Sequence, residues 1–271
     1  MKRKWSSILT RLFLATLLLV TALACPSSAQ TLYERSLAQF NARAGQAATD
    51  DYTFVVLGDS RDGDETFAKA LAMAKSFDPL FILHGGDYSS EGGEAETASF
   101  LALVQRTVPE IPLFVVFGNH EDRRVFPKEI GPYDFTLTAK RLDLTLVALD
   151  NADGSLRPPQ LDWLRAELAS ARGTVFVAMH IPPRTDRWRG HTFKQGADEL
   201  RRIVAKSRVQ GLFFSHSHQY DRSEFGGVPA FITGGAGAPL VWFAFNGERV
   251  HHILVVRVKK GRANFQMVPI K

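Results

Sequence analysis

The sequence predicts an α/β protein in which a largely parallel sheet is followed by a second or mixed sheet. From Thr53 to Phe117, short apolar runs alternate with helical patterns, as expected of parallel strands joined by right-handed crossovers. Two further runs, at 133–137 and 142–149, indicate a hairpin instead. Polar residues follow several of the runs, and in such folds functional residues gather at the carboxyl ends of the strands.

The apolar and β-branched runs predict strands that are buried on both faces. In chain order these are 53–57, 80–83, 113–117, 174–179 and the run that ends at Phe214, with later strands at 229–233, 241–245 and 250–258. Helices are predicted up to about 75, over 95–106, over 195–206 and from Pro158, because proline suits the first helical turn. Residues 30–50 read as a short helix or a lead-in. We find no repeat or linker, so 30–271 is expected to be a single domain.

Residues 1–29 have the layout of a secretory signal peptide. Basic residues precede an apolar run at 12–24, and Ser27 to Ala29 offer small residues for cleavage. The run is shorter than the roughly 20 residues that span a bilayer, although a retained membrane anchor is the alternative. The stretch Leu23-Ala24-Cys25 is similar to a bacterial lipoprotein processing site. We therefore expect an exported protein, periplasmic or secreted, with a lipid anchor at Cys25 as an option and no membrane span in the mature form.

The charge of the chain gives no support to nucleic-acid binding. The formal net charge is +5, but the first 29 residues hold four basic residues and no acidic ones. The remainder has 29 basic and 28 acidic residues, which is nearly neutral. Cys25 is the only cysteine, so a chain cut after Ala29 would contain neither a thiol nor a disulfide.

The most informative stretch is the apolar run that ends in His216 and His218. Residues two apart on a strand point to the same side, so both imidazoles can face one spot, and imidazole is the commonest metal ligand among side chains. Other predicted strands also end in acidic, amide or histidine residues: Asp59, Asp87, Asn119, His120 and His180. Any single one of them could simply cap a helix or turn.

Together these groups predict a bound cation. Two carboxylates and several imidazoles in one crevice would leave buried charge unpaired, at a cost of several kcal/mol per ion. Oxygen and nitrogen ligands without thiolate suit manganese, iron or zinc. Two ions about 3.5–4 Å apart, bridged by one carboxylate, would produce hydroxide near neutral pH and clamp a phosphoryl group. The set therefore predicts phosphoester hydrolysis.

The strand-end residues resemble the ordered motif set of the calcineurin-like metallophosphoesterases. The matching motifs are Gly58-Asp59-x-Arg61, Gly86-Asp87, Gly118-Asn119-His120-Glu121, His180 and His216-x-His218. The resemblance spans about 54–237. Two further stretches are similar to the secreted acid-phosphatase branch of that family: Leu149-Asp150-Asn151 with Gln160 to Trp163, and Ile232 to Gly237.

The resemblance implies a fold and a role for each motif residue. The fold would be a four-layer αββα sandwich of two mixed β-sheets flanked by helices. Asp87 would bridge two ions, Asp59 and His218 would hold the first, and Asn119, His180 and His216 would hold the second. His120 would not bind metal but would stabilise the transition state or protonate the leaving oxygen. A metal-bridged hydroxide would attack phosphorus in line, on a small phosphomonoester by preference, with a phosphodiester as the alternative substrate.

The sequence departs from the family pattern at Arg61, where a metal-binding histidine is usual. A guanidinium has no lone pair and cannot be a ligand. In one interpretation, which we favour, two ions bind, water or substrate completes the first ion, and Arg61 grips a phosphate oxygen as a catalytic and substrate-binding residue. In the other, a single ion binds and Arg61 pairs with Asp59.

The remaining polar and aromatic residues are expected to be structural, and some of them have a functional alternative. The loop after His180 carries Arg184, Arg187, Arg189 and His191, which form either a solvated loop or a phosphate-facing rim with His191 as a substrate-binding residue. The same two options apply to Arg123 and Arg124. The other candidates are expected to be structural, although the tryptophans could stack on a substrate: His84, His251, His252, Trp188 and Trp242.

The sequence is also compatible with two other classes of protein. Gly58-Asp59-Ser60 is also typical of a serine esterase with Ser60 as the nucleophile, but no histidine here has an aspartate three positions before it, as that chemistry usually supplies. Loss of the usual histidine at Arg61 is also compatible with a catalytically impaired protein that binds a phosphorylated ligand. The remaining intact motifs favour an enzyme.

Overall fold

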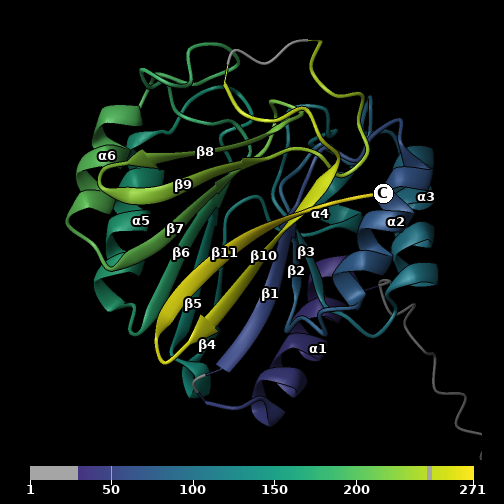
Figure 1. Ribbon diagram of the computed structural model, residues 1–271, viewed down its shortest axis with the longest axis horizontal. Coiled ribbons are helices and arrows are strands. Elements are labelled where there is room, and N and C mark those ends of the chain that lie inside the picture. Colours follow the sequence, from purple (N-terminus) through teal and green to yellow (C-terminus); the bar gives the residue numbers. More distant parts are fainter. Residues whose placement is uncertain (1–29, 50, 243–245) are drawn as a thin grey trace, which may run out of the picture.

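Two mixed β-sheets face each other and helices cover their outer faces, as Figure 1 shows. The computed structural model describes residues 30–49, 51–242 and 246–271. Helices α5 and α6 lie on the outer side of the six-stranded sheet, and α2 and α3 on the outer side of the five-stranded sheet. This arrangement confirms the predicted αββα sandwich. The predicted signal segment, 1–29, lies outside the described residues.

The five-stranded sheet has the order β11-β10-β1-β2-β3. Strands β1, β2 and β3 run parallel, while β10 and β11 pair antiparallel beside β1. Its strands are β1 (Asp51–Leu57), β2 (Ile82–His84), β3 (Leu113–Val115), β10 (His252–Lys259) and β11 (Arg262–Pro269). Its helices are α1 (Leu32–Gln46), α2 (Asp64–Lys75) and α3 (Glu94–Thr107). Helix α1 begins with a capping box between Thr31 and Glu34.

The six-stranded sheet has the order β4-β5-β6-β7-β9-β8, with β5, β6, β7 and β9 parallel. Its strands are β4 (Phe135–Ala139), β5 (Leu144–Leu149), β6 (Thr174–Met179), β7 (Val209–Phe214), β8 (Tyr220–Phe225) and β9 (Val228–Thr233). The associated helices are the 3-10 helix η1 (Lys140–Leu142), α5 (Pro158–Ser170) and α6 (Ala197–Ala205), whereas α4 (Phe126–Glu129) packs on the five-stranded sheet through Phe126. The predicted hairpin is thus β4–β5.

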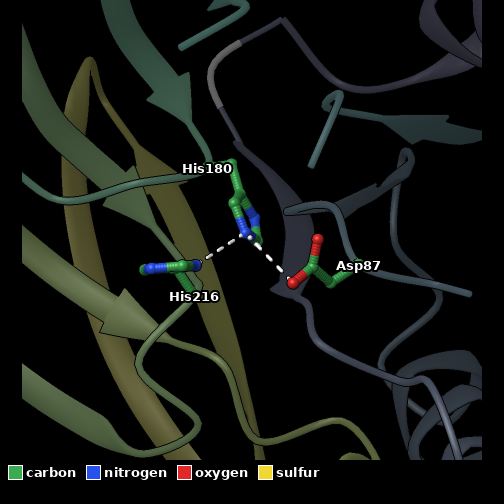
Figure 2. Close-up of side chains that lie close together, drawn as sticks. All are labelled: Asp87, His180 and His216. Atoms are coloured by element: carbon green, nitrogen blue, oxygen red, sulfur yellow. Dashed lines mark hydrogen bonds and ion pairs between the residues drawn. The ribbon is translucent and has the colours of Figure 1, made fainter. Parts of the chain in front are cut away.

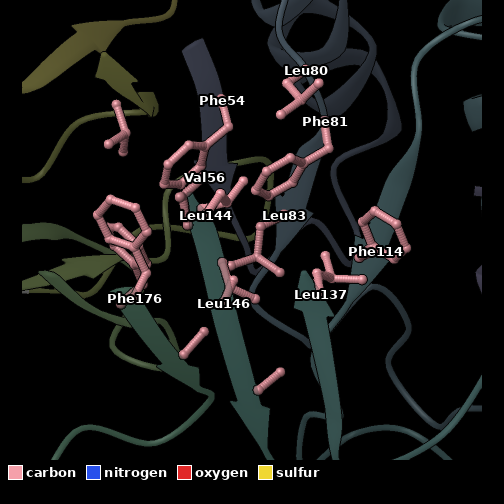
Figure 3. Close-up of a cluster of buried hydrophobic side chains, with 14 of the residues drawn as sticks. Phe54, Val56, Leu80, Phe81, Leu83, Phe114, Leu137, Leu144, Leu146 and Phe176 are labelled. Carbon is pink, nitrogen blue, oxygen red and sulfur yellow. The ribbon is translucent and has the colours of Figure 1, made fainter. Parts of the chain in front are cut away.

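The core has three layers because each central strand is buried on both faces. In β1, Phe54 and Val56 point between the two sheets, whereas Val55 and Leu57 face the helices. This two-residue alternation is why the strand reads as a continuous apolar run. Phe54 stacks on Phe81 with ring centroids 4.8 Å apart, and Figure 3 shows this cluster between the sheets.

Several elements differ from the prediction. The expected strand at 241–245 is wrong for Val241 and Trp242, which are not in a strand, while 243–245 lie outside the described residues. Strand β8 was not predicted because its polar residues belong to an edge strand, held by antiparallel pairing with β9. Strand β11, another unpredicted edge strand, alternates exposed and half-buried residues for the same reason. Within the described part of the chain, no helix is both long and apolar enough to cross a membrane.

Candidate metal centre

The polar strand-end residues meet at one edge, where the carboxyl ends of the parallel strands from both sheets come together. Glycine permits this close approach. A Cβ at Gly58 or Gly85 would lie only 2.2 or 2.0 Å from the Oγ of Ser215, which directly follows β7 of the other sheet. The glycines before Asp59 and Asp87 therefore let the ends of β1 and β2 press against the end of β7.

Four of the predicted metal ligands have left-handed backbone conformations. The φ angles are 56° for Asp59, 58° for Asp87, 68° for His216 and 33° for His218. Such conformations cost a non-glycine residue about 1 kcal/mol or more, and they concentrate at functional sites. Here each one turns the chain sharply as it leaves a strand, so that the side chain points back into the cluster.

The first group of possible ligands consists of Asp59, Asp87 and His218, whose ligand atoms all lie within 4.8 Å of one another. The Nε2 of His218 is 3.5 Å from Oδ1 of Asp59. Its Nδ1 lies 2.8 Å from the carbonyl of Pro239, which places the proton on Nδ1 and leaves the Nε2 lone pair facing the group.

The second group consists of Asp87, His180 and His216, again with ligand atoms within 4.8 Å. Figure 2 shows His180 between the other two, 3.3 Å from Asp87 and 3.2 Å from His216. The Nδ1 of His180 donates to the carbonyl of Gly85 at 2.8 Å, so its Nε2 faces inward. Asn119 joins this group through its Oδ1, 3.0 Å from the same Nε2. Asp87 is therefore shared between the two groups.

The residues present fit a pair of metal ions. Asp59 is fully buried, and its Oδ1 has no hydrogen-bond partner among the described residues. Burial alone would lower the pKa of His180, but the carboxylates of Asp87 and Asp59 outweigh it and raise that pKa to about 10. A cation would give the buried carboxylate oxygen of Asp59 a partner and would neutralise the negative charge of the two carboxylates.

Two histidines of the set are held in the neutral form that binds metal. Burial, together with the charge of His180, lowers the pKa of His216 to about 3. Burial also lowers the pKa of His218. Metal binding at these two positions therefore requires no loss of a proton near neutral pH.

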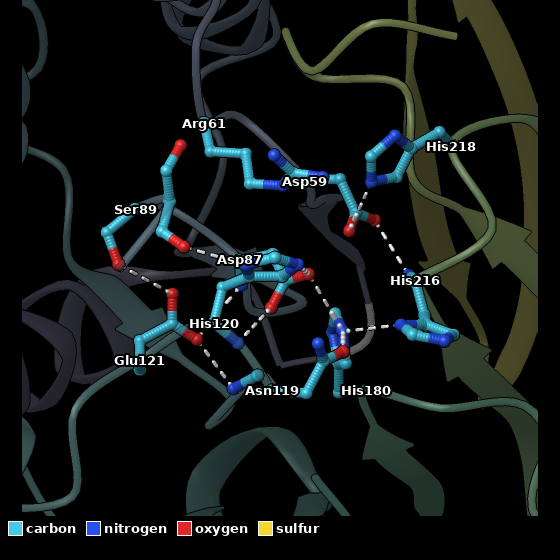
Figure 4. A network of polar contacts seen from close by, with 12 residues as sticks. Asp59, Arg61, Asp87, Ser89, Asn119, His120, Glu121, His180, His216 and His218 are labelled. Carbon is cyan, nitrogen blue, oxygen red and sulfur yellow. Dashed lines mark hydrogen bonds and ion pairs between the residues drawn. The ribbon is translucent and has the colours of Figure 1, made fainter. Parts of the chain in front are cut away.

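His120 lies beside the two groups without belonging to either. Its Nε2 is 4.0 Å from Oδ2 of Asp87, and its backbone N–H donates to Oδ1 of Asp87 at 3.1 Å. The Nδ1 donates to the carbonyl of Ser90 at 2.7 Å, which turns the Nε2 toward the cluster, as Figure 4 shows. A third of its side chain is exposed, so a substrate can reach it.

Arg61 and His191 lie around the metal centre. Arg61 donates to Asp62 at 2.9 Å, so within the described part of the chain its ion pair is with Asp62 and not with Asp59. His191 is exposed, and its ring centroid is 5.7 Å from that of His216.

The loop that carries His191 is anchored by a buried carboxylate on β8. Asp221 accepts hydrogen bonds from Nη2 of Arg187 at 2.6 Å and from Nε1 of Trp188 at 2.9 Å. Trp188 is buried against Phe214. Arg187 and Trp188 are therefore structural, and they fix the loop whose far side places His191 beside the metal centre.

The structure argues against a serine esterase. Ser60 does contact a histidine, because its Oγ lies 3.0 Å from Nε2 of His84. However, Nδ1 of His84 accepts from the N–H of Gly86, so its Nε2 carries the proton and cannot accept one from the serine. Burial lowers the pKa of His84 to about 3. As expected, His84 is a core histidine, packed edge-on against Phe67 and Phe100.

The other basic and aromatic candidates have structural places. Arg123 pairs with Asp150 at 2.6 Å and lies over the ring of Phe117. Arg124 pairs with Asp122. His252 is buried and His251 half-buried, as expected of structural residues. The expected packing role is wrong for Trp242, whose side chain is 90% exposed.

Glu121 is a buried residue to which the sequence assigned no role. Its Oε2 accepts from the N–H groups of Gly118 at 2.7 Å and Asp87 at 3.1 Å, and its Oε1 accepts from the N–H of Tyr88 at 2.9 Å. It therefore joins the loop that carries Asp87 to the loop that carries Asn119. In the sequence, its position in the Gly118 to Glu121 motif was the one indication that Glu121 has a role.

Replacing Glu121 by Gln should destabilise the protein and weaken its metal binding together. The carboxylate accepts all four of its hydrogen bonds and donates none. The NH₂ group of the new amide would therefore face hydrogen-bond donors and could not replace the lost acceptor. We expect a loss of about 1–3 kcal/mol in the free energy of unfolding, measured by urea denaturation, and a lower manganese affinity. Glu94→Gln, at an exposed position, is the matched control. Wild-type stability and affinity in Glu121→Gln would contradict this role.

Comparisons with known proteins agree with this geometry. A family model described as calcineurin-like phosphoesterase matches residues 52–220. A probable cyclic nucleotide phosphodiesterase from Rhodococcus erythropolis is 28% identical over 171 residues, which cover 57% of this chain and 56% of that protein. Another protein described in this way, from Fibrobacter succinogenes, is 31% identical over 152 residues, which cover 51% and 57%. The chain thus spans little more than half the length of these relatives.

A solved structure shows the same fold at low sequence identity. A purple acid phosphatase from yellow lupin (Lupinus luteus) seeds superimposes with a TM-score of 0.62 and 13% identity, covering 81% of this chain and 52% of that chain. At this level of identity the likeness concerns the fold alone.

Proposed function

Because this chain belongs to the calcineurin-like phosphoesterase family, we propose that it is a phosphoric ester hydrolase and that its substrates are phosphomonoesters. We further propose that Asp59, Asp87 and His218 hold one divalent ion, and that Asp87, Asn119, His180 and His216 hold a second. The two ligand groups that share Asp87 support this division. Manganese, iron and zinc suit the oxygen and nitrogen donors.

When bound, two such ions activate a water molecule and neutralise the phosphoryl oxygens. The side chains around them would do the rest. His120 faces the cluster with its Nε2 and would protonate the leaving oxygen, because the Ser90 carbonyl keeps its ring in this orientation. His191, exposed beside His216, would contact a phosphate oxygen or the leaving group.

The positive charge of Arg61 favours a monoester over a diester as the substrate. A phosphomonoester bears one more negative charge near neutral pH than a diester does. The charge of Arg61 lies near the first group, where it adds to burial in lowering the pKa of His218. Its side chain is 22% exposed, and its Nε has no partner among the described residues. A guanidinium in this place can pair with the additional phosphate oxygen.

The choice of substrate class is tested by comparing two chromogenic substrates. The protein would be assayed with manganese on p-nitrophenyl phosphate and on bis(p-nitrophenyl) phosphate. A higher kcat/KM for the monoester supports our proposal. A higher value for the diester would overturn it and favour a phosphodiesterase, the second candidate. The descriptions of both relatives as probable phosphodiesterases support that candidate.

Replacing Arg61 by His should change metal affinity and substrate affinity in opposite directions. The imidazole supplies a fourth ligand to the first ion, so we expect that ion to bind about tenfold more tightly or better. The monoester loses its guanidinium partner, so KM should rise. Calorimetric manganese titration and steady-state kinetics measure the two effects. Arg61→Ala is the control, because it should raise KM while tightening metal binding much less than Arg61→His does. Unchanged metal affinity in Arg61→His would remove Arg61 from the first site.

We also propose that 30–271 is one domain that is exported after cleavage of 1–29. The basic start and the apolar run at 12–24 support this, with a lipid anchor at Cys25 as the variant form. Mass determination of the cell-purified protein distinguishes a chain that begins at Gln30, a chain lipidated at Cys25 and an uncleaved chain.

A further inference from the structure

Exposed basic residues gather at the edge of the sheets opposite the metal centre. The parallel strands carry the metal ligands at their carboxyl ends, so the turns that enter β5, β6 and β7 lie at the other end, together with the turn between β10 and β11. Figure 1 shows the β10–β11 turn at this lower end. We call these side chains the basic edge: Lys140, Arg141, Arg172, Lys206, Arg208, Lys259, Lys260 and Arg262, all exposed.

The basic edge is a single surface formed by both sheets. The side chain of Gln210, at the start of β7, donates to the carbonyl of Gly261 at 2.8 Å and accepts from the N–H of Ala263 at 2.9 Å. The N–H of Thr174 donates to the carbonyl of Asp143 at 2.8 Å. These bonds tie the turns before β6 and β7 to η1 and to the β10–β11 turn. Between α5 and α6, a groove of about 920 Å³ opens beside Arg172, Lys206 and Arg208.

Acidic partners neutralise little of this charge. Within the described part of the chain, Lys259 is the one member with an ion pair, to Asp51 at 3.8 Å. Asp143 is the one acidic residue described in these turns, and Asp78 and Glu110, which precede β2 and β3 at the same edge, pair with Arg43 and Lys75. Because residues 30–271 are almost neutral overall, eight basic residues against two acidic ones are a local concentration of positive charge. A field of this kind attracts anions.

We propose that the basic edge binds the anionic headgroups of a membrane surface. Several separate turns spread the charge over a broad edge, which suits an extended anionic plane. Nucleic acid is disfavoured because single strands usually bind through exposed aromatic side chains. Trp242, the one exposed large apolar side chain among the described residues, lies instead beside the metal centre, where the N–H of Val241 donates to the carbonyl of His218. Bound in this way, the protein holds its metal centre away from the lipid.

Sedimentation with vesicles tests this proposal. The cell-purified protein, in the form that mass determination identifies, and variants with the same N-terminus are compared on phosphatidylcholine vesicles with and without phosphatidylglycerol. Lys206→Glu with Arg208→Glu, and separately Lys260→Glu with Arg262→Glu, should each weaken binding to the anionic vesicles by about tenfold or more. Binding of the wild type should also fall as salt rises, because the Debye length is only about 8 Å at physiological ionic strength.

The matched control is Lys128→Glu with Lys194→Glu, which makes the same charge change at exposed positions away from the basic edge. We expect it to bind like the wild type. Turnover of p-nitrophenyl phosphate should be unchanged in all three double variants, which shows that they are folded and keeps this test separate from that of the proposed function. Equal binding by edge and control variants would overturn the proposal. So would binding to heparin or RNA without binding to anionic vesicles.

Discussion

Replacing Asp87 by Asn should lower kcat/KM by at least about 1000-fold, because this one carboxylate serves both ligand groups. An amide oxygen carries no net charge and cannot bridge two cations as a carboxylate does. We expect the bound metal to fall from two ions to one or none, measured by elemental analysis of the purified protein. The pKa of the neighbouring His180 should also fall in this variant. Burial lowers that pKa, and the Asp87 carboxylate is the main group that raises it.

The control for this variant is Asp162→Asn, an exposed aspartate of α5 that pairs with Arg165. It should keep its metal and its turnover. If Asp87→Asn retained two ions and most of its activity, Asp87 would not be the bridging ligand and the division into two metal sites would be wrong.

Replacing His120 by Asn should lower turnover by about 10²–10⁴-fold and leave the metal content unchanged. His120 lies 4.0 Å from Asp87 and belongs to neither ligand group. The loss should be larger for an alkyl phosphate than for p-nitrophenyl phosphate, because an alkoxide needs a proton to leave and p-nitrophenolate does not. His251→Asn, outside both groups, is the control.

Two results would contradict the role given to His120. Equal losses on both substrates would mean that it stabilises the phosphoryl group and does not protonate the leaving oxygen. Loss of metal in His120→Asn would mean that it supports the metal sites through its contacts with Asp87 and Ser90.

The sequence predicts the layers of the fold because the central strands are buried on both faces. The run at 174–179 is apolar after its first residue, Thr174, and β6 has those bounds. Edge strands have no such pattern. In β8, Asp221 is buried only because Arg187 and Trp188 reach it from a loop about 34 residues earlier in the chain. Apolar content predicted a strand at 241–245, but Trp242 is almost fully exposed.

The set of groups at the site could be predicted because parallel strands bring their carboxyl ends to one edge. All six predicted metal ligands meet there, and His191 reaches the same place through its anchored loop. The left-handed backbone at Asp59 and His216 could not be predicted, since it arises where strands from two sheets converge. The role of Glu121 was also hidden, because it depends on two loops that meet only in the folded chain.

We propose that phosphoester hydrolysis by this protein requires two ions bound by these residues. The most direct measurement removes metal from the protein with a chelator, adds manganese back in steps, and records the ions bound per chain and the turnover of p-nitrophenyl phosphate at each step. We predict negligible turnover without metal, and full turnover only as the second equivalent binds. Full turnover after one equivalent would contradict the two-ion site, and turnover that survives complete metal removal would contradict the whole account.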